Sequence, residues 1–168
     1  VIKYIAVQLP QCQVVMVGPV DKEFPQSELL KAPNIHFLGG KKPDTLASYV
    51  DYFDICINPQ ILNNVTIGNY PRKVDEYLAM GKAVVATNTE AMQLFKDYTW
   101  LCDSKEDYVT HIQYLLNHRE QLDGKMEKIR RRAFALSHSW ENSMGLLGDA
   151  YYQVKRVQMD KQQKGSVS

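Results

Sequence analysis

Residues 71–87 constrain the fold most, because they carry the signals of a helix, a tight turn and a buried strand in the run PRKVDEYLAMGKAVVAT. Pro71 suits the first helical position, where its missing N–H would have no partner anyway. Gly81 suits the position just past the helix end, and the β-branched run at 83–87 predicts a strand. In open α/β sheets, ligands bind beyond the carboxyl ends of the strands, and helix N-termini offer N–H groups to phosphate. The candidate binding residues at this helix start are Asn69, Tyr70, Pro71 and Arg72.

The rest of the chain alternates short apolar runs with helical patterns. We expect strands at 13–17, 35–38, 54–57, 83–87 and 98–102, and helices at 1–9, 45–51, 90–95 and 105–117. Asp44 is the expected N-cap of the helix at 45–51, and the chain from Arg119 onward is expected to be helical, with Ser137 or Ser139 capping a final helix. Strands separated by helices favour parallel pairing with right-handed crossovers. The predicted class is therefore α/β, a Rossmann-like open parallel sheet with helices on both faces and a helical C-terminal end.

Length and charge limit the classes of protein to consider. A chain of 168 residues, 45% hydrophobic, suits one domain, which we place at 1–160 with a flexible tail at 161–168. A net charge of +1 does not indicate a nucleic-acid partner. The densest basic cluster, at 125–132, is interrupted by Met126, Glu127 and Ile129. We expect it to be the solvated face of a helix, and a weak contact with anionic lipid is the alternative.

The cysteines and the apolar runs indicate a reduced, cytoplasmic protein. Cys12, Cys56 and Cys102 are odd in number and lie in or beside apolar runs, which predicts core thiols and neither a disulfide framework nor a metal site. No apolar run reaches the roughly 18 residues that a membrane span needs, and no signal peptide is present.

Four segments together resemble the C-terminal domain of the retaining GT-B glycosyltransferases of group 1 (GT4-like). They occur in the order of that family and are QVVMVGP at 13–19, residues 34–59, the helix–turn–strand unit at 71–87 and residues 138–156. The resemblance implies the donor-binding half of a GT-B fold. It also implies an acceptor-binding domain upstream, and a first strand whose loop helps hold the diphosphate, both absent from this chain. We therefore expect the isolated domain to bind donor and to be inactive alone.

The family resemblance also implies an activity. The full enzyme would be a hexosyltransferase that moves a sugar from a nucleotide-diphosphate sugar, with UDP or GDP as nucleotide, to a hydroxyl of a glycan or lipid acceptor. It would retain the anomeric configuration, need no metal ion or other cofactor, and serve glycan, lipid or cell-envelope polysaccharide biosynthesis. A cytoplasmic location, with peripheral contact at the inner face of the membrane, is the matching expectation.

Glu76 is the first candidate among the binding residues. By resemblance it matches the second acid of the family's Glu-x7-Glu pattern, whose carboxylate accepts hydrogen bonds from both ribose hydroxyls. The alternative is a surface ion pair with Arg72, four residues earlier on the same helix face. Lys73 lies three residues before Glu76 and, by resemblance, is a phosphate contact; the alternative is a solvated surface lysine.

Glycines mark the remaining candidates. The first acid of the Glu-x7-Glu pattern falls at position 68, where this chain has Gly68 instead. Thr66, Asn69 or main-chain groups near Gly68 are the replacements we consider, and no catalytic residue is assigned. Gly39 and Gly40 fall where the family's loop supplies main-chain groups to the nucleobase, since glycine lets a flat ring approach the backbone closely. A plain turn is the alternative for this pair.

Two other classes of protein stay open. A non-hydrolysing sugar-nucleotide epimerase shares the GT-B architecture, although the acid and histidine positions of that family find no clear match here. A non-catalytic nucleotide-binding or scaffold domain is favoured if the Gly68 departure marks lost chemistry. Turnover restored by an upstream domain would separate an enzyme from a scaffold.

Overall fold

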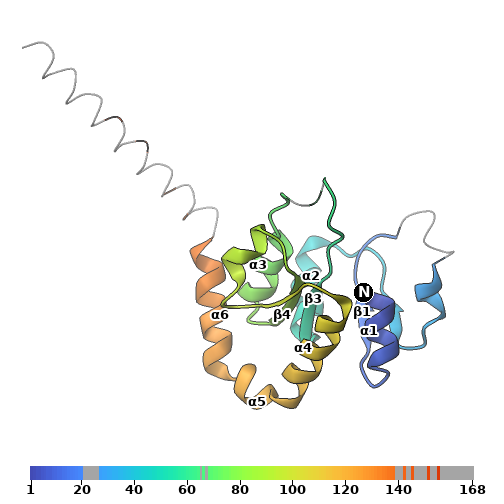
Figure 1. The fold of residues 1–168 in the computed structure, drawn as a ribbon. Coiled ribbons are helices and arrows are strands. Elements are labelled where there is room, and N and C mark those ends of the chain that lie inside the picture. Colours follow the sequence, from blue (N-terminus) through green and yellow to red (C-terminus); the bar gives the residue numbers. More distant parts are fainter. Residues whose placement is uncertain are drawn as a thin grey trace, which may run out of the picture.

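The strands of this computed structural model are all parallel and form two separate ladders (Figure 1). The structure describes residues 1–20, 27–64, 66 and 68–138, together with 142, 145, 151 and 155. In the first ladder β1 (Val14–Met16) pairs with β2 (Ile35–Phe37). In the second, β4 (Ala83–Thr87) lies between β3 (Ile55–Asn58) and β5 (Trp100–Cys102). Parallel pairing is confirmed, but β1 and β3 are not hydrogen-bonded to each other, so the expected continuous sheet is interrupted.

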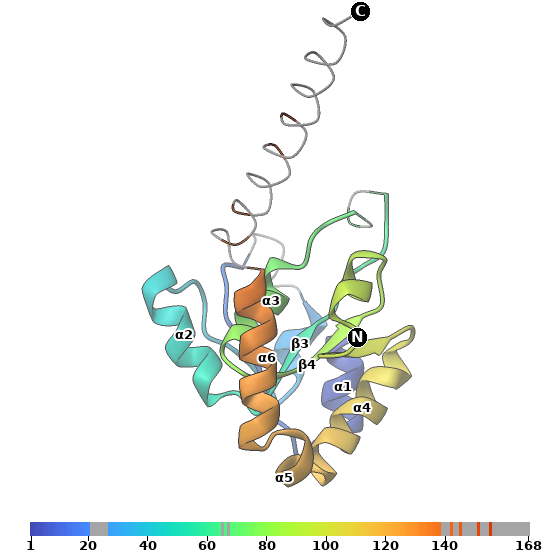
Figure 2. The same ribbon diagram turned by 90° about the vertical axis from the view of Figure 1, so that its left-hand side faces the viewer.

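Helices cover both faces of the strands (Figure 2). On one side lie α1 (Ile2–Gln8) and α4 (Lys105–Asn117). On the other lie α2 (Pro43–Tyr52), α3 (Arg72–Ala79) and α6 (Lys125–Ser137). The connections include α5 (Arg119–Leu122) and the 3₁₀ helices η2 (Glu28–Lys31) and η3 (Ala91–Phe95). The predicted α/β class, with helices on both faces, is confirmed.

The alternation of side chains along β4 explains this two-faced packing. Ala83 and Val85 belong to the core shared with α1 and α4, whereas Val84 and Ala86 belong to the core shared with α3 and α6. All four are at most 1% exposed. Successive side chains of a strand point to opposite faces, so a continuous apolar run is what a strand buried on both faces needs.

The helix starts differ from the sequence predictions. Asp44 is not an N-cap, because α2 begins at Pro43 with Lys42 as its N-cap. Proline has a fixed φ and no N–H, both of which suit the first helical residue. Pro71, by contrast, is itself the N-cap of α3, with φ −83° and ψ 65°, and the first helical residue is Arg72.

Two further elements were predicted too long or of the wrong type. The helix expected at 90–95 is the 3₁₀ helix η3, and the strand expected at 98–102 is limited to β5. Ser137 is the last residue of α6 and not the cap of a later helix. Ser139, the tail at 161–168 and almost all of the segment after 138 lie outside the described residues. The domain boundary at 160 stays a prediction.

The basic cluster at 125–132 is not a wholly solvated face, because Arg131 is only 2% exposed. Its Nη1 donates to the carbonyl of Gly81 (3.1 Å) and to Oδ1 of Asp123 (2.8 Å), and its Nη2 donates to the carbonyl of Leu122. A planar guanidinium with five donors can satisfy several acceptors at once, which makes this burial tolerable. The sequence prediction was therefore wrong at this residue.

The cysteines are free thiols. Cys56 and Cys102 are buried and Cys12 is half-buried, in agreement with the predicted core positions. Burial raises the pKa of Cys56, and likewise that of Cys102, to about 12. In the part of the chain that the structure describes, no helix is long and apolar enough to cross a bilayer. No group of three or more His, Cys, Asp or Glu residues in that part is arranged to hold a metal ion.

Candidate functional site

The candidate residues follow the carboxyl ends of two strands. Gly39 and Gly40 follow β2, and the loop at 58–70 joins β3 to α3 (Figure 1). Carboxyl ends of parallel strands lie at one edge of a sheet, which is where α/β proteins bind ligands. The order β2–β1 and β3–β4–β5 puts β1 between the two glycines and β3. The structure therefore places both groups at one edge without bringing them into contact.

A buried hydroxyl network fixes the base of the loop at 58–70. The hydroxyl of Tyr108 bonds Oγ1 of Thr87 (2.9 Å) and donates to the carbonyl of Asn58 (3.2 Å). Oγ1 of Thr87 also accepts from the N–H of Gln60 (2.8 Å). Tyr108 is 1% exposed, and this burial raises its pKa. Sequence reasoning missed Thr87 and Tyr108, although a threonine that ends an apolar strand at the binding edge was a signal for such a role.

Thr66 organises the middle of the loop. Its hydroxyl donates to the carbonyl of Ile61, and its carbonyl accepts from Nε2 of Gln60 at 2.6 Å. Gly68 is exposed, and a Cβ built there would meet no heavy atom within 4 Å. Its φ is not positive, so neither the backbone nor crowding requires glycine at this position. An acidic side chain would fit where the Glu-x7-Glu pattern expects one.

Three exposed charged side chains lie on the N-terminal half and middle of α3. Arg72, Lys73 and Glu76 are all exposed, and within the described residues none of them forms an ion pair. The alternative reading of Glu76, a surface pair with Arg72, is therefore not realised. Residues three and four apart lie on the same helix face. Lys73 and Glu76 thus present an ammonium and a carboxylate side by side, available to a ligand.

The N–H groups at the start of α3 are only partly available. Asn69 N–H donates to the carbonyl of Thr66 (3.1 Å), and Arg72 N–H donates to that of Tyr70 (3.0 Å). Pro71 has no N–H. Neither Tyr70 N–H nor Lys73 N–H donates to another described residue. These two N–H groups, and not those of all four residues at 69–72, are therefore available to a phosphate.

Tyr70 ties the loop to the helix. Its hydroxyl donates to Oδ2 of Asp75 (2.7 Å), and its ring lies 5.9 Å from that of Phe95. Burial, followed by the hydrogen bond and the charge of Asp75, raises the pKa of Tyr70. Oδ1 of Asp75 is buried and has no hydrogen-bond partner among the described residues. Tyr70 therefore acts through position, holding the loop at 58–70 against α3.

Gly39 has a structural reason to be glycine. Its φ is +68°, in the region that L side chains rarely adopt, and its carbonyl accepts from the N–H of Gly18 at 3.1 Å. This bond joins the ends of β1 and β2. Gly40 is exposed and has no such requirement. The turn accounts for Gly39, and a role for either glycine at a nucleobase stays a prediction.

Comparisons with known proteins agree on the family. The model of the family described as glycosyl transferases group 1 matches residues 1–118. Over 145 residues, the chain is 30% identical to TuaH of Bacillus subtilis (strain 168), whose name assigns it to teichuronic acid biosynthesis as a glycosyltransferase. The match covers 83% of this chain and 36% of that relative. The chain thus spans about a third of the relative's length.

A solved structure shows the same fold. Sucrose-phosphate synthase from Thermosynechococcus elongatus superposes with a TM-score of 0.66 at 16% sequence identity. The superposition covers 93% of this chain and 42% of the synthase chain. At that identity the likeness concerns the fold alone, and it supports the Rossmann-like arrangement of a GT-B half.

Proposed function

Because the chain belongs to the group 1 glycosyltransferases, we propose that it is the donor-binding domain of an enzyme that moves a sugar from a nucleotide-diphosphate sugar to a hydroxyl acceptor. The reaction would retain the configuration of the anomeric carbon. The acceptor, a glycan or a lipid, would bind mainly to another part of the whole enzyme. The likeness to TuaH favours polysaccharide biosynthesis for the cell envelope as the process that the enzyme serves.

The observation that carries this proposal is that Lys73 and Glu76 are both exposed on α3 and form no ion pair within the described residues. They lie next to the loop at 58–70, which hydrogen bonds hold in place. The carboxylate of Glu76 offers two acceptor oxygens to the vicinal hydroxyls of a ribose. The ammonium of Lys73 and the N–H groups of Tyr70 and Lys73 offer positive charge to a diphosphate. One ligand that carries both groups is a nucleotide-diphosphate sugar.

The same groups would serve the chemistry. As the bond between the anomeric carbon and the diphosphate oxygen breaks, negative charge grows on the departing diphosphate. Fixed cations and N–H dipoles stabilise such charge without having to reorganise, which is a large term in enzyme catalysis. The acceptor oxygen then bonds the anomeric carbon, and its proton passes to the departing diphosphate oxygen. This scheme requires no metal ion, and we assign the charge stabilisation to Lys73 and the start of α3.

Calorimetric titration of the whole polypeptide with UDP- and GDP-sugars tests the proposal, repeated with Glu76→Ala. Loss of charged hydrogen bonds to the ribose should weaken binding by about 1.5–3 kcal/mol, roughly 10- to 150-fold in Kd. Glu120→Ala is the matched control, since Glu120 is an exposed residue of α5 away from the strand ends, and it should leave Kd unchanged. Equal Kd values for Glu76→Ala and the parent would refute the ribose role. No binding of any nucleotide-sugar would refute the donor proposal.

A non-catalytic nucleotide-binding domain is the second candidate, and Gly68 is the observation that favours it. The position is open to a side chain, yet the chain carries no acid there. Donor binding without sugar transfer by the whole polypeptide, over a panel of glycan and lipid acceptors, would favour this alternative. Transfer to any of these acceptors would exclude it.

A further inference from the structure

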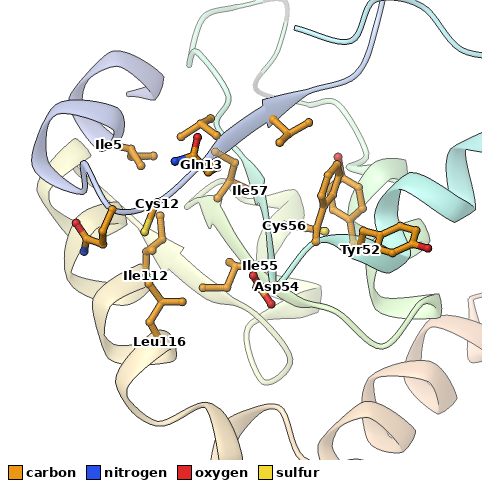
Figure 3. A pocket seen from close by; sticks show the side chains of 15 residues that line it. Ile5, Cys12, Gln13, Tyr52, Asp54, Ile55, Cys56, Ile57, Ile112 and Leu116 are labelled. Atoms are coloured by element: carbon orange, nitrogen blue, oxygen red, sulfur yellow. The ribbon is translucent and has the colours of Figure 1, made fainter. Parts of the chain in front are cut away.

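Apolar side chains line a cleft of about 540 Å³ between the two ladders (Figure 3). Two of its polar side chains are engaged, because Asp54 pairs with Arg119 at 2.5 Å and Oε1 of Gln13 is bonded to Nε2 of His36 at 2.6 Å. The cleft lies between strands and helices of the same fold. The outer face of α6 is different, because it carries apolar side chains on the outside of the described structure.

This outer face of α6 is a row of exposed apolar residues. Met126 is 74% exposed, Ile129 47% and Leu136 63%, and Ala133 is exposed as well. Their spacing alternates between three and four positions, which places all of them on one side of a helix with 3.6 residues per turn. Helix α6 lies at the outside of the molecule in both views (Figure 1, Figure 2). We call these residues the α6 stripe.

The opposite side of α6 is already packed in the core. Arg131 and Ala135 are buried, and the ring of Phe134 stacks on that of Tyr98 with centroids 3.9 Å apart. At about 100° per residue, these three residues of α6 lie across the helix from the stripe. The stripe is therefore a second apolar side that the core does not use. A row of exposed apolar residues, unlike a single one, indicates an interaction surface.

Cations border the α6 stripe on both sides. At about 100° per residue, Lys125 and Arg132 lie along one border and Arg130 lies along the other. Lys125 and Arg132 form no ion pair within the described residues. Arg130 pairs at 3.2 Å with Glu127, the only acidic residue of α6. The borders thus carry net positive charge, which complements a partner whose apolar groups are flanked by acids.

Two of the border cations are held in place by the fold. Nη2 of Arg132 donates to the carbonyl of Met80 (3.3 Å), and Nη2 of Arg130 donates to the carbonyl of Asp97. The guanidinium of Arg130 also lies 4.7 Å from the centre of the Tyr98 ring. Side chains that are already held lose less conformational freedom when a partner binds. Fixed charges on both borders suit a partner that has a regular structure of its own.

The spacing of the α6 stripe fits an α-helix as that partner. In paired helices, apolar residues recur at alternating spacings of three and four, and charges at the flanking positions select the partner. A narrow row of this kind is typical of a seam between two helices, whereas helices that face a core carry a wider apolar face.

Two other occupants fit the α6 stripe less well. Helices that lie in a membrane surface are anchored by Trp, Phe and Leu, and the stripe has no aromatic residue. A second copy of α6 would bring its own Lys125, Arg130 and Arg132 against these cations in a parallel or an antiparallel pair. Like charges at the flanking positions disfavour such a pair.

We propose that the α6 stripe docks an amphipathic α-helix of another protein, with an apolar seam and Asp or Glu along both borders. Residues 125–136 extend over about 18 Å of helix, so about three turns of the partner are enough. The exposed residues of α3 are not part of this surface. The inference goes beyond donor binding and holds whatever ligand the candidate site takes.

Fluorescence anisotropy with a labelled synthetic peptide and the whole polypeptide tests this. The probe is a helix of about three heptads with Leu at the seam and Glu at the flanking positions, and the comparison peptide has Lys in place of Glu. At low salt the Glu peptide should bind at least about tenfold more tightly than the Lys peptide, and this ratio should fall as salt is added. Equal binding of the two peptides, or no binding of the Glu peptide, would overturn the proposal.

Substitutions locate the binding surface. Met126→Ser combined with Leu136→Ser should weaken binding of the Glu peptide at least about tenfold, because two apolar contacts are lost. Val7→Ser is the matched control, since Val7 is 62% exposed and belongs to α1 on the other side of the strands, and it should leave Kd unchanged. All three side chains are exposed, and circular dichroism checks that the variants are folded. An unchanged Kd in the folded double variant would overturn the proposal.

Three controls identify a different occupant. By light scattering, a dimer that the double variant converts to a monomer would overturn the proposal in favour of a second copy. Sedimentation with vesicles of phosphatidylglycerol and phosphatidylcholine that the double variant loses would do so in favour of anionic lipid. Resistance of Ala133→Cys to N-ethylmaleimide without peptide would show that another part of the whole polypeptide covers the stripe, which also overturns it. Peptide binding by a monomer that passes all three controls supports the helical partner.

Discussion

Replacing the buried Arg131 of α6 should strongly destabilise the protein. Arg131→Met keeps most of the side-chain volume but removes the donors to the carbonyls of Gly81 and Leu122 and to Asp123. The side chain of Asp123 is only 12% exposed, and Lys128 at 3.1 Å would be its remaining ion-pair partner. The buried carboxylate of Asp123 then keeps only part of its compensating positive charge, and the carbonyls of Gly81 and Leu122 lose a hydrogen-bond donor.

Removing one partner of a buried ion pair costs about 3–5 kcal/mol. Lys128 keeps part of the Asp123 charge compensated, so we expect about 3 kcal/mol for Arg131→Met. The double variant Arg131→Met with Asp123→Asn should lose less than the sum of the two single variants, because the buried charge is removed together with its partner. The coupling should amount to about 0.5–3 kcal/mol.

Urea unfolding followed by circular dichroism measures these losses, provided that the m-value stays constant. Lys125→Ala is the matched control, because Lys125 is an exposed basic residue of the same helix and forms no ion pair within the described residues. It should change stability by no more than about 0.5 kcal/mol. A loss below about 1 kcal/mol for Arg131→Met, or strict additivity with Asp123→Asn, would show that the buried bonds do not hold α6 to the Gly81 turn.

Two further predictions concern a turn and a cap. Gly81→Ala should lower the free energy of unfolding, measured in urea, by about 1–2 kcal/mol, because φ is +75° and the new Cβ would lie 3.1 Å from Nε of Arg132. Gly18→Ala is the control and should leave stability unchanged, because a Cβ there meets no heavy atom within 4 Å. Equal losses for the two variants would contradict this strain argument. Hydrogen bonds from Ser104 and from Asp103 N–H lower the pKa of Asp107 in the folded protein. The contribution of the Asp107 carboxylate to folding stability is therefore fully present above its pKa in the unfolded chain, and it is lost as the pH falls through its pKa in the folded protein. The stability difference between the parent and Asp107→Asn should be constant from about pH 7 to 5 and shrink below about pH 4; a difference unchanged at about pH 3 would contradict it.

Local signals predicted most of the fold and the helix that carries two of the candidate site residues. The apolar run of β4 and the glycine at position 81 depend on residues that are neighbours in sequence, so both were predicted at the right place. The exposed Lys73 and Glu76 fell on one face of a predicted helix, and the structure keeps them there. Whether they bind a nucleotide-sugar stays a prediction.

The errors lie where distant residues decide the outcome. The burial of Arg131 depends on a carbonyl 50 positions earlier in the chain, which no periodicity around residue 131 reveals. The bond between Tyr108 and Asn58 spans 50 positions too, and it links a helix to the end of a strand that is not its neighbour in sequence. The interrupted sheet is of the same kind, because strand order is a property of the whole fold and not of any one strand.

The small side chains of β4 have an evolutionary consequence. Ala86 and Val84 belong to the same buried cluster as Val74 and Leu78 of α3, and all four are fully buried. Their volumes set how far α3 stands from the sheet, and therefore where Lys73 and Glu76 stand relative to the strand ends. A lineage that exchanges Ala86 for a larger residue would shift the helix outward while keeping an apolar core. Selection on ligand affinity would thus act on the buried side chains of β4 as well as on the exposed residues of α3.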